Sequence, residues 1–130
     1  MEQNENRVLY DWLTFTTKIH SLPDVIDLLG LQKVSFQQMK GRYCYQDRLN
    51  YDGINIMYNG REEMGICVEL SGQGCRDFET YGNGDYKGIF DLIIRNWNEN
   101  PEKRDMNITR LDVAYDDFFG FLDLDYLMFA

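Results

Sequence analysis

Residues 51–60 read Y-D-G-I-N-I-M-Y-N-G, a short apolar run between two turn signals. The dipeptides Asp52-Gly53 and Asn59-Gly60 favour type I′ hairpin turns, because both central residues of that turn need positive φ. A strand is therefore predicted between them, and the flanking segments have the composition of strands as well. We expect an antiparallel meander whose three strands cover residues 43–51, 54–58 and 64–71.

A strand and a helix are predicted before the meander. Residues 8–17 are rich in aromatic and β-branched types, which is typical of a strand. The stretch from Ser21 to Asp24 resembles a capping box with proline in the first turn, so a helix should begin there. Gly30 predicts the end of that helix, because glycine readily adopts the left-handed conformation found after a helix.

Two more helices are predicted after the meander. Gly72-Gln73-Gly74 interrupts the third strand, and a short helix is expected over Cys75–Tyr81. Asp85 would cap a longer helix, in which apolar residues recur at helical spacing. That helix should end near Asn100-Pro101, since the residue before proline avoids the helical region.

A last strand over 107–117 completes the pattern, and Gly120 should end it before a further helix begins near Leu122. The order β-α-β-β-β-α-α-β predicts an α+β fold, a mainly antiparallel sheet with helices on one face, RRM-like or ferredoxin-like. A chain of 130 residues, 44% of them hydrophobic, fits a single domain over 1–130. Because it ends in an apolar run, we expect it to be the N-terminal region of a longer protein.

The composition narrows the classes of function. The formal net charge is −9, with 22 acidic and 13 basic residues, which argues against a nucleic-acid partner because phosphate contacts rest on Lys and Arg. The three cysteines have no metal-ligand spacing and predict reduced thiols in a cytoplasmic protein. No stretch of the sequence approaches the ~18 apolar residues that cross a membrane.

Residues 109–117, T-R-L-D-V-A-Y-D-D, alternate apolar and charged side chains in the last predicted strand. The apolar set belongs to the buried face of the sheet, since successive side chains of a strand point to opposite faces. Arg110, Asp112 and Asp116 would then share the open face.

Glu69 belongs to the strand 64–71, which alternates in the same way and would place this carboxylate on the open face. We expect 64–71 and 107–117 to be side by side, so that Glu69, Asp112 and Asp116 converge. Three hard oxygen ligands suit Mg²⁺ or Mn²⁺. Asp112 and Asp116 are residues i and i+4 of one strand and lie ~13 Å apart, which is too far for one ion unless the strand bends or bulges near Ala114. The expected pair is therefore Asp112 with Glu69 directly opposite, where Cβ atoms come within ~5.5 Å.

An ordinary solvated face explains the same residues. Acidic side chains are common on exposed sheet surfaces, and the spacing alone favours this interpretation over a metal site. Arg110 would then form a surface ion pair with Glu69, worth ~0–1 kcal/mol.

A glycine-rich turn and three tyrosines can each be explained either by ligand binding or by the fold alone. The stretch from Gly72 to Arg76 is a glycine-rich turn that leads into a helix, where backbone N–H groups can bind a phosphate. A simple strand-to-helix break explains this turn equally well. Tyr43, Tyr45 and Tyr51 would stack on bases if they face outward, whereas packing against the core is the commoner role of such residues.

Three segments of the chain resemble one known family. They are Val68–Arg76 (V-E-L-S-G-Q-G-C-R), Asn107–Asp117 (N-I-T-R-L-D-V-A-Y-D-D) and Tyr10–Thr16 (Y-D-W-L-T-F-T). These segments resemble the Rep_trans-type replication initiation factors, the rolling-circle initiators of Gram-positive plasmids, phages and conjugative elements. The resemblance spans nearly the whole chain and corresponds to the N-terminal region of that family.

This resemblance implies a metal-dependent DNA nicking and strand-transfer protein. A tyrosine would attack a phosphodiester at the origin, and Mg²⁺ or Mn²⁺ held by carboxylates would polarise the scissile phosphate. By position, Asp112 matches the aspartate of the family's Arg-Leu-Asp motif, and Asp116 the acidic residue four positions later. Glu69 matches the glutamate before Leu-Ser-Gly, although its assignment to the metal rests on the face argument. Arg110 and Arg76 are the expected DNA contacts.

The resemblance also places the nucleophile outside this chain. The family's nucleophilic tyrosine lies downstream of the matched region, so residues 1–130 alone are expected to be inactive. Origin DNA is the expected partner of the full-length protein, homodimerisation stays open, and no membrane association is expected. The alternative function is a non-enzymatic acidic α+β module that binds a protein partner through the open sheet face.

Overall fold

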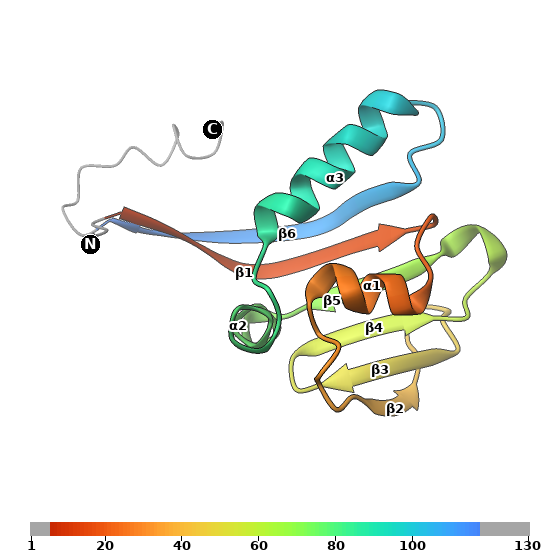
Figure 1. Ribbon diagram of the computed structural model, residues 1–130, viewed down its shortest axis with the longest axis horizontal. Coiled ribbons are helices and arrows are strands. Elements are labelled where there is room, and N and C mark those ends of the chain that lie inside the picture. Colours follow the sequence, from red (N-terminus) through yellow and green to blue (C-terminus); the bar gives the residue numbers. More distant parts are fainter. Residues whose placement is uncertain (1–5, 118–130) are drawn as a thin grey trace.

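The computed structural model describes the backbone of residues 6–117 and the side chains of residues 8–114. The break predicted at Gly120 and the helix predicted near Leu122 lie outside these described residues. Figure 1 shows the elements, which are β1 (Asn6–Thr17), α1 (Leu22–Leu29), β2 (Gln37–Lys40), β3 (Asp47–Tyr51), β4 (Ile54–Tyr58), the 3₁₀ turn η1 (Glu62–Met64), β5 (Ile66–Leu70), α2 (Gly72–Tyr81), α3 (Tyr86–Glu99) and β6 (Met106–Asp117).

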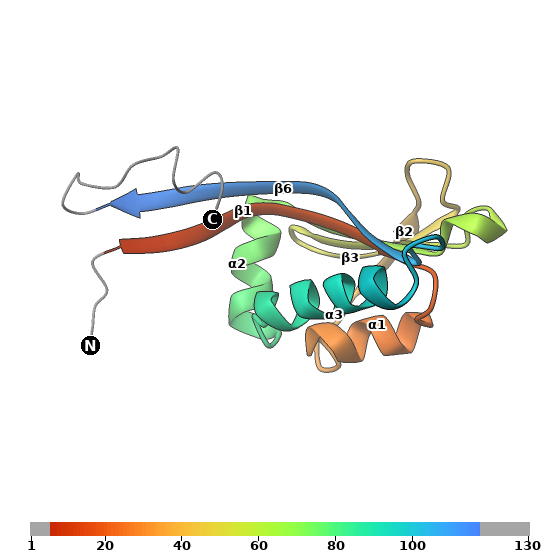
Figure 2. The same ribbon diagram turned by 90° about the horizontal axis from the view of Figure 1, so that it is seen from above.

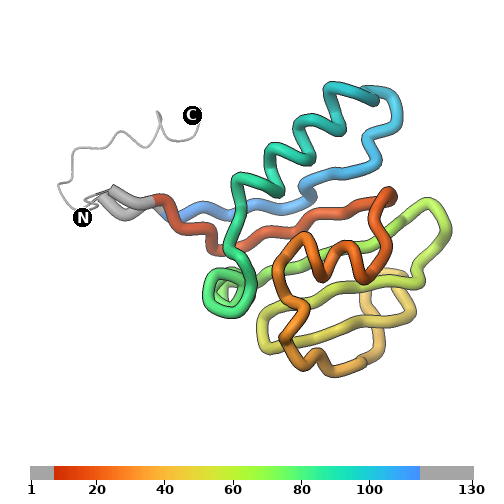
Figure 3. The backbone as a smooth tube through the Cα atoms, in the orientation of Figure 1, coloured from red at the N-terminus to blue at the C-terminus, as the bar shows by residue number. Residues whose placement is uncertain are grey.

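The strands form one six-stranded sheet in the order β2-β3-β4-β5-β1-β6, in which every neighbouring pair is antiparallel. Figure 2 shows α1, α2 and α3 on one side of this sheet, and we call the other side the open face. β1 and β6 continue past the other strands as a two-stranded arm (Figure 3). The predicted fold class, α+β with an antiparallel sheet and helices on one face, is confirmed.

The core lies between the sheet and the helices. Alternate residues of the inner strands point to the helix side, where each helix contributes its apolar face. The buried apolar side chains of this core are Leu13, Phe15, Val25, Leu29, Leu31, Ile54, Ile56, Ile66, Val68, Leu70, Cys75, Phe78, Tyr86, Ile89, Ile93 and Met106. Full burial of a large apolar side chain stabilises the fold by ~1.5–3 kcal/mol. This layer therefore determines which side chains are left for the open face.

The ends of α1 and α3 agree with their sequence signals. The hydroxyl of Ser21 accepts a hydrogen bond from the Asp24 N–H at 3.3 Å, and the Asp24 carboxylate accepts one from the Ser21 N–H at 3.5 Å. Gly30 ends α1 in the left-handed conformation with φ of 69°. Asp85 caps α3 by accepting a hydrogen bond from the Gly88 N–H at 2.9 Å.

The meander is confirmed as β3-β4-β5, but only one of its two predicted hairpin turns forms. Tyr51 pairs with Ile54 across the two-residue turn at Asp52-Gly53. Asp52 has φ of 47°, whereas Gly53 is not among the residues with positive φ, so the turn departs from type I′. After Asn59-Gly60 the chain runs through η1 before β5, because the polar stretch Arg61–Glu63 has no apolar side chain to offer the sheet.

β2 has no counterpart in the sequence prediction. Its four residues are all exposed at the edge of the sheet, so they lack the apolar alternation that predicts a strand. The strand predicted over 43–51 begins only at Asp47. Tyr43 and Cys44 have φ of 57° and 71°, which no strand residue adopts, and they belong to the loop that rises on the open face (Figure 2).

The glycine-rich stretch Gly72-Gln73-Gly74 is the first turn of α2, not a break before it. The Ser71 hydroxyl caps this turn by accepting a hydrogen bond from the Gly74 N–H at 3.2 Å. The Ser71 N–H donates to the Gly53 carbonyl at 3.2 Å, which brings the tip of the β3–β4 hairpin against the helix. A Cβ at Gly74 would overlap that carbonyl, and a Cβ at Gly53 would lie 2.6 Å from the Ser71 hydroxyl oxygen. Both glycines are therefore required by this close approach.

The expectation that the strands 64–71 and 107–117 lie side by side is wrong, because β1 lies between β5 and β6. Leu13 and Phe15 of β1 are fully buried, as suits an interior strand, whereas Leu111 and Val113 of the edge strand β6 are 41% and 44% exposed. Alternation identifies the face of each side chain, but it does not distinguish adjacent strands from strands two positions apart.

We predict opposite effects for two alanine substitutions in the first turn of α2. Alanine normally favours a helix over glycine by ~1 kcal/mol, and a Cβ at Gly72 would have only an ordinary contact of 3.4 Å to the Asp11 carbonyl. Gly72→Ala should therefore be neutral or stabilising. Gly74→Ala should destabilise by ~1–3 kcal/mol, since its Cβ would push the hairpin away. Urea unfolding of both variants measures this, and equal stability would contradict the proposed close approach.

Candidate functional site

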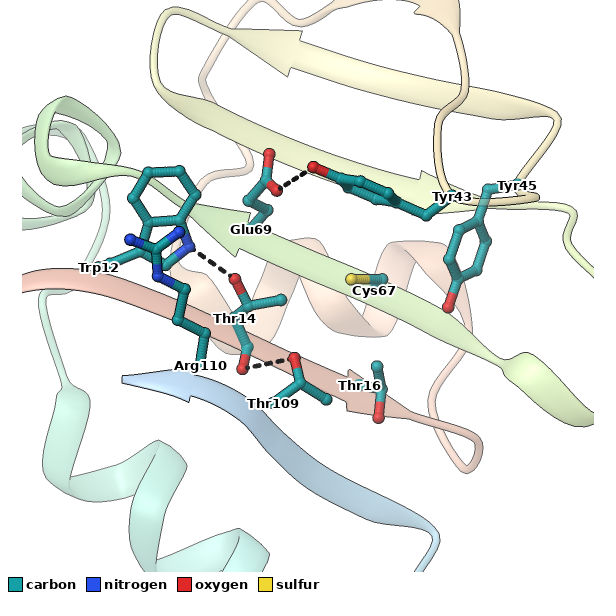
Figure 4. A pocket seen from close by; sticks show the side chains of 9 residues that line it. All are labelled: Trp12, Thr14, Thr16, Tyr43, Tyr45, Cys67, Glu69, Thr109 and Arg110. Carbon is teal, nitrogen blue, oxygen red and sulfur yellow. Dashed lines mark hydrogen bonds between the residues drawn. The ribbon is translucent and has the colours of Figure 1, made fainter. Parts of the chain in front are cut away.

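A hollow of about 390 Å³ lies on the open face, over β5, β1 and β6 (Figure 4). Its volume falls in the lower part of the range for small-molecule sites. Three threonines, three aromatic residues, one thiol, one carboxylate and one guanidinium line it. The lining residues are Trp12, Thr14, Thr16, Tyr43, Tyr45, Cys67, Glu69, Thr109 and Arg110.

The ladder across β5, β1 and β6 aligns the predicted site residues in a way that the sequence did not reveal. Glu69 pairs with Thr14, and Thr14 pairs with Arg110, so one row crosses the three strands. Asp112 pairs with Trp12 in the next row. The predicted direct opposition of Asp112 and Glu69 is therefore wrong, because it assumed that their strands are adjacent.

Arg110 combines an ion pair with an aromatic contact. Its guanidinium lies 3.8 Å from the centre of the Trp12 ring, a cation–π arrangement. It also donates to both carboxylate oxygens of Asp112, at 2.8 and 3.4 Å. The hydrogen bond from Arg110 lowers the pKa of Asp112, and Asp112 in turn raises the pKa of Arg110. The ion pair expected between Arg110 and Glu69 is thus replaced by one along the same strand.

A hydrogen bond to Thr14 orients the Trp12 ring on which Arg110 lies. Its indole N–H donates to the Thr14 hydroxyl at 2.8 Å. β6 carries an extra residue at Thr109, where its register with β1 shifts, and the Thr109 hydroxyl donates to the Thr14 carbonyl at 3.3 Å. This β-bulge interrupts the ladder between Arg110 and the first residues of β6, which pair with β1 in a shifted register.

Glu69 is the buried acid of the hollow, with 6% of the residue exposed. One carboxylate oxygen accepts a hydrogen bond from the Asn55 amide at 3.2 Å, and the other accepts one from the Tyr43 hydroxyl at 3.3 Å. The Arg42 guanidinium lies 3.8 Å from the first oxygen. The Asn55 carbonyl oxygen accepts in turn from Arg48 at 2.8 Å, so the carboxylate ends a chain of polar contacts across β3, β4 and β5.

Two acidic groups beside Glu69 stay protonated at neutral pH. Burial and then the charge of Glu69 raise the pKa of the Cys67 thiol to about 12. Burial and then the neighbouring thiol Cys67 raise the pKa of Tyr45 to about 12. A thiolate is the nucleophilic and metal-binding form of cysteine, so Cys67 acts here as a neutral lining group.

The three tyrosines considered for stacking have different positions. Tyr43 is 62% exposed and reaches over the open face, with its hydroxyl toward Glu69 (Figure 4). Tyr45 is buried in a small cluster with Met57 and Cys67. Tyr51 packs edge-on against Tyr81, with ring centres 5.5 Å apart. Of these three tyrosines, only Tyr43 has a ring free to stack. The sequence could not predict this exposure, because Tyr43 lies in a loop of residues with left-handed φ and loops have no periodic pattern.

Arg76, predicted as a DNA contact, lies on α2 and therefore on the helix side of the sheet. Its guanidinium donates to the Tyr10 carbonyl at 2.5 Å and to Glu79 at 2.8 Å, and it lies 3.9 Å from Asp11. These contacts join α2 to β1. Arg76 and Arg110 thus belong to opposite faces, and a DNA contact by Arg76 stays a prediction.

The predicted metal cluster is not assembled in the described part of the chain. The side chain of Asp116 lies outside the described residues, although its backbone pairs with Arg7. Among the side chains that are described, no three from His, Cys, Asp and Glu lie close enough to share an ion. The metal role of Asp112, Glu69 and Asp116 stays a prediction. No helix of the described residues is long and apolar enough to cross a membrane.

The chain is similar to a putative DNA relaxase and to a rolling circle replication initiator protein. The putative DNA relaxase NicK of Bacillus subtilis (strain 168) is 28% identical over 112 residues, which cover 84% of this chain and 30% of that protein. A solved structure of a rolling circle replication initiator protein from Geobacillus stearothermophilus has a TM-score of 0.67 and 32% identity, covering 95% of this chain and 49% of that chain. The chain thus spans less than half the length of either relative.

A family model matches most of the chain. Residues 7–95, which include all of β1 but its first residue, the meander, α2 and most of α3, match the model described as the rolling circle replication initiation protein N-terminal domain. The resemblance seen in the sequence is therefore confirmed, and the chain belongs to the family of rolling circle replication initiation protein N-terminal domains.

Proposed function

We propose that the full-length protein nicks one strand of origin DNA, and that the open face of this chain supplies part of the reaction site. Family membership and the likeness to a DNA relaxase support DNA as the substrate. The observation that carries the proposal is the pair Arg110–Asp112, which lies on the open face beside the hollow. It offers a cation for a phosphate and a carboxylate for a metal within one strand.

Asp112 fits the role of a cation ligand. Its side chain is 45% exposed, and Arg110 lowers its pKa, so the carboxylate is ionised at neutral pH. We propose Mg²⁺ or Mn²⁺ as the ion, with Asp112 as its ligand in this chain. Asp116 lies four residues farther along β6, ~13 Å away, because residues 113–116 pair with β1 in regular register. When bound, such an ion would polarise the scissile phosphate and offset the charge that develops on its oxygens.

Glu69 fits a direct ligand less well. Its two oxygens already accept hydrogen bonds from Asn55 and Tyr43, and Arg42 lies nearby. A divalent ion would have to displace at least one of these donors and would meet repulsion from the guanidinium. We therefore assign Glu69 to the hollow and the ion to Asp112.

The nucleophile of this reaction belongs, in the proposal, to a segment beyond residue 130. Tyr45 is buried with its pKa raised to about 12, which disfavours the phenolate. Tyr43 is exposed and its hydroxyl donates to Glu69. It is set aside only because the family resemblance places the nucleophile downstream. The reaction would take place in the cytoplasm, where replicating DNA is found.

Asp112→Asn in the full-length protein should reduce metal-dependent nicking at least 100-fold. The change removes the charge that holds the ion, whereas an exposed isosteric substitution costs only ~0.5 kcal/mol of stability. The assay incubates supercoiled origin plasmid with Mg²⁺ or Mn²⁺ and measures the open-circular product. Asp91→Asn, an exposed aspartate of α3 that pairs with Lys87, is the matched control and should retain activity. Full activity of Asp112→Asn would rule out its metal role.

Residues 1–130 alone should neither nick the plasmid nor bind duplex DNA strongly. A polarised phosphate gains little without a covalent attacker, and the charge of −9 repels a polyanion. Repulsion reaches farther at low ionic strength, about 30 Å at 0.01 M, so duplex binding should not tighten as salt is removed. The same nicking assay and a gel-shift titration measure these effects. Metal-dependent nicking by this chain would place the nucleophile within it.

A further inference from the structure

The hollow on the open face has features beyond the Arg110–Asp112 ion pair that the proposed nicking reaction uses. One wall is the stacked pair of Arg110 and Trp12. The side chain of Arg110 is 51% exposed, so one plane of its guanidinium covers the indole while much of the side chain remains open to solvent. Planar guanidinium groups and aromatic rings are the surfaces on which unpaired nucleobases stack.

The opposite wall is Tyr43. Tyr43 is 62% exposed, and it lies over the open face in a loop where two consecutive non-glycine residues, Tyr43 and Cys44, have left-handed φ. Such conformations are strained and persist where the surrounding structure imposes them, often at binding sites. The ring contributes little to the core, and a hydrogen bond of 3.3 Å to Glu69 ties its hydroxyl. A ring exposed in this way is available to a planar ligand.

The floor between the walls is Glu69. A nearly buried carboxylate repels a phosphate, and among the described side chains it has no companion acids for a metal ion. It accepts hydrogen bonds, so it suits a ligand that is flat and has N–H groups on its edge. Guanine presents two such groups, N1–H and N2–H, at a spacing that matches the two oxygens of a carboxylate.

We propose that this hollow binds an unpaired base of single-stranded DNA, with guanine preferred. The base stacks between the Arg110–Trp12 pair and Tyr43, and Glu69 accepts hydrogen bonds from its edge in place of the Tyr43 hydroxyl. Arg42, whose side chain is 44% exposed beside the carboxylate, is placed to meet a flanking phosphate. The inference rests on the proposed function for its DNA partner, but base binding needs neither the metal ion nor the nucleophile.

The test measures binding in EDTA, where nicking is impossible. Fluorescein-labelled ten-nucleotide oligomers of thymidine, with a single central dG, dA, dC or dT, are titrated with the 130-residue chain and followed by anisotropy. The dG oligomer should bind at least fivefold more tightly than the all-thymidine oligomer. Equal affinity for the four oligomers, or no binding by any of them, would overturn the proposal.

Three variants locate the base. Tyr43→Ala should weaken binding of the dG oligomer at least fivefold, while Tyr81→Ala, which removes a ring of similar exposure on α2, should leave it unchanged. Glu69→Gln should remove the preference for dG and keep the weaker binding common to all oligomers. If Glu69→Gln does not fold, as judged by thermal unfolding, Tyr43→Ala decides the matter because it lies in an exposed loop. An unchanged affinity in Tyr43→Ala would contradict the stacking site.

This assay separates the two proposals. Base preference in EDTA without nicking by the full-length protein would overturn the proposed reaction and leave the base site standing. Nicking by the full-length protein without base preference in EDTA would overturn the base site and leave the proposed reaction standing.

Discussion

The pairing of β1 with β5 on one side and with β6 on the other determines the rest of the open face. Leu13 and Phe15 bury the helix side of β1, so Trp12 and Thr14 must point the other way. Because Thr14 is paired on both sides, it brings Glu69 and Arg110 into one row. The register of β1 with β6 shifts between Tyr10 and Trp12 and again between Thr14 and Phe15, and these shifts determine which residues lie beside the row. A strand order with β6 beside β5 would have produced a different site from the same side chains.

Signals that act over a few residues allowed much of this fold to be predicted. Ser21, Gly30 and Asp85 bound their helices as expected, since each cap is satisfied by the adjacent turn. Alternation placed Glu69 and Arg110 on the open face for the same local reason. The order of the strands depends on contacts between distant segments, for which no local pattern exists. The polar edge strand β2 was missed because it buries none of its residues.

Asp112 and Glu69, two acids of the predicted site, differ in their surroundings and therefore in the ligands that they suit. Asp112 is exposed, and a charged donor lowers its pKa, so its carboxylate remains available to a cation that competes with Arg110. Glu69 has neutral donors on both oxygens and almost no contact with water. Burial of a carboxylate is costly unless such donors replace its hydration. In the reaction proposed above, these contacts suit Glu69 to accepting hydrogen bonds better than to binding the ion.

The acidic charge of the chain conflicts with a DNA partner only if charge is counted over the whole molecule. Exposed charges more than about 10 Å apart are largely screened at 0.1 M salt, so a bound strand responds mainly to the groups near it. Around the hollow the guanidinium groups of Arg42 and Arg110 balance the carboxylates of Glu69 and Asp112, so this part of the open face has no excess of acid. Acidic residues such as Asp91 lie on α3, on the far side of the sheet. Screening therefore weakens the repulsion that the rest of the molecule exerts on a strand at this face. The proposed site accordingly favours a single strand that enters by its bases over a duplex bound through its phosphates.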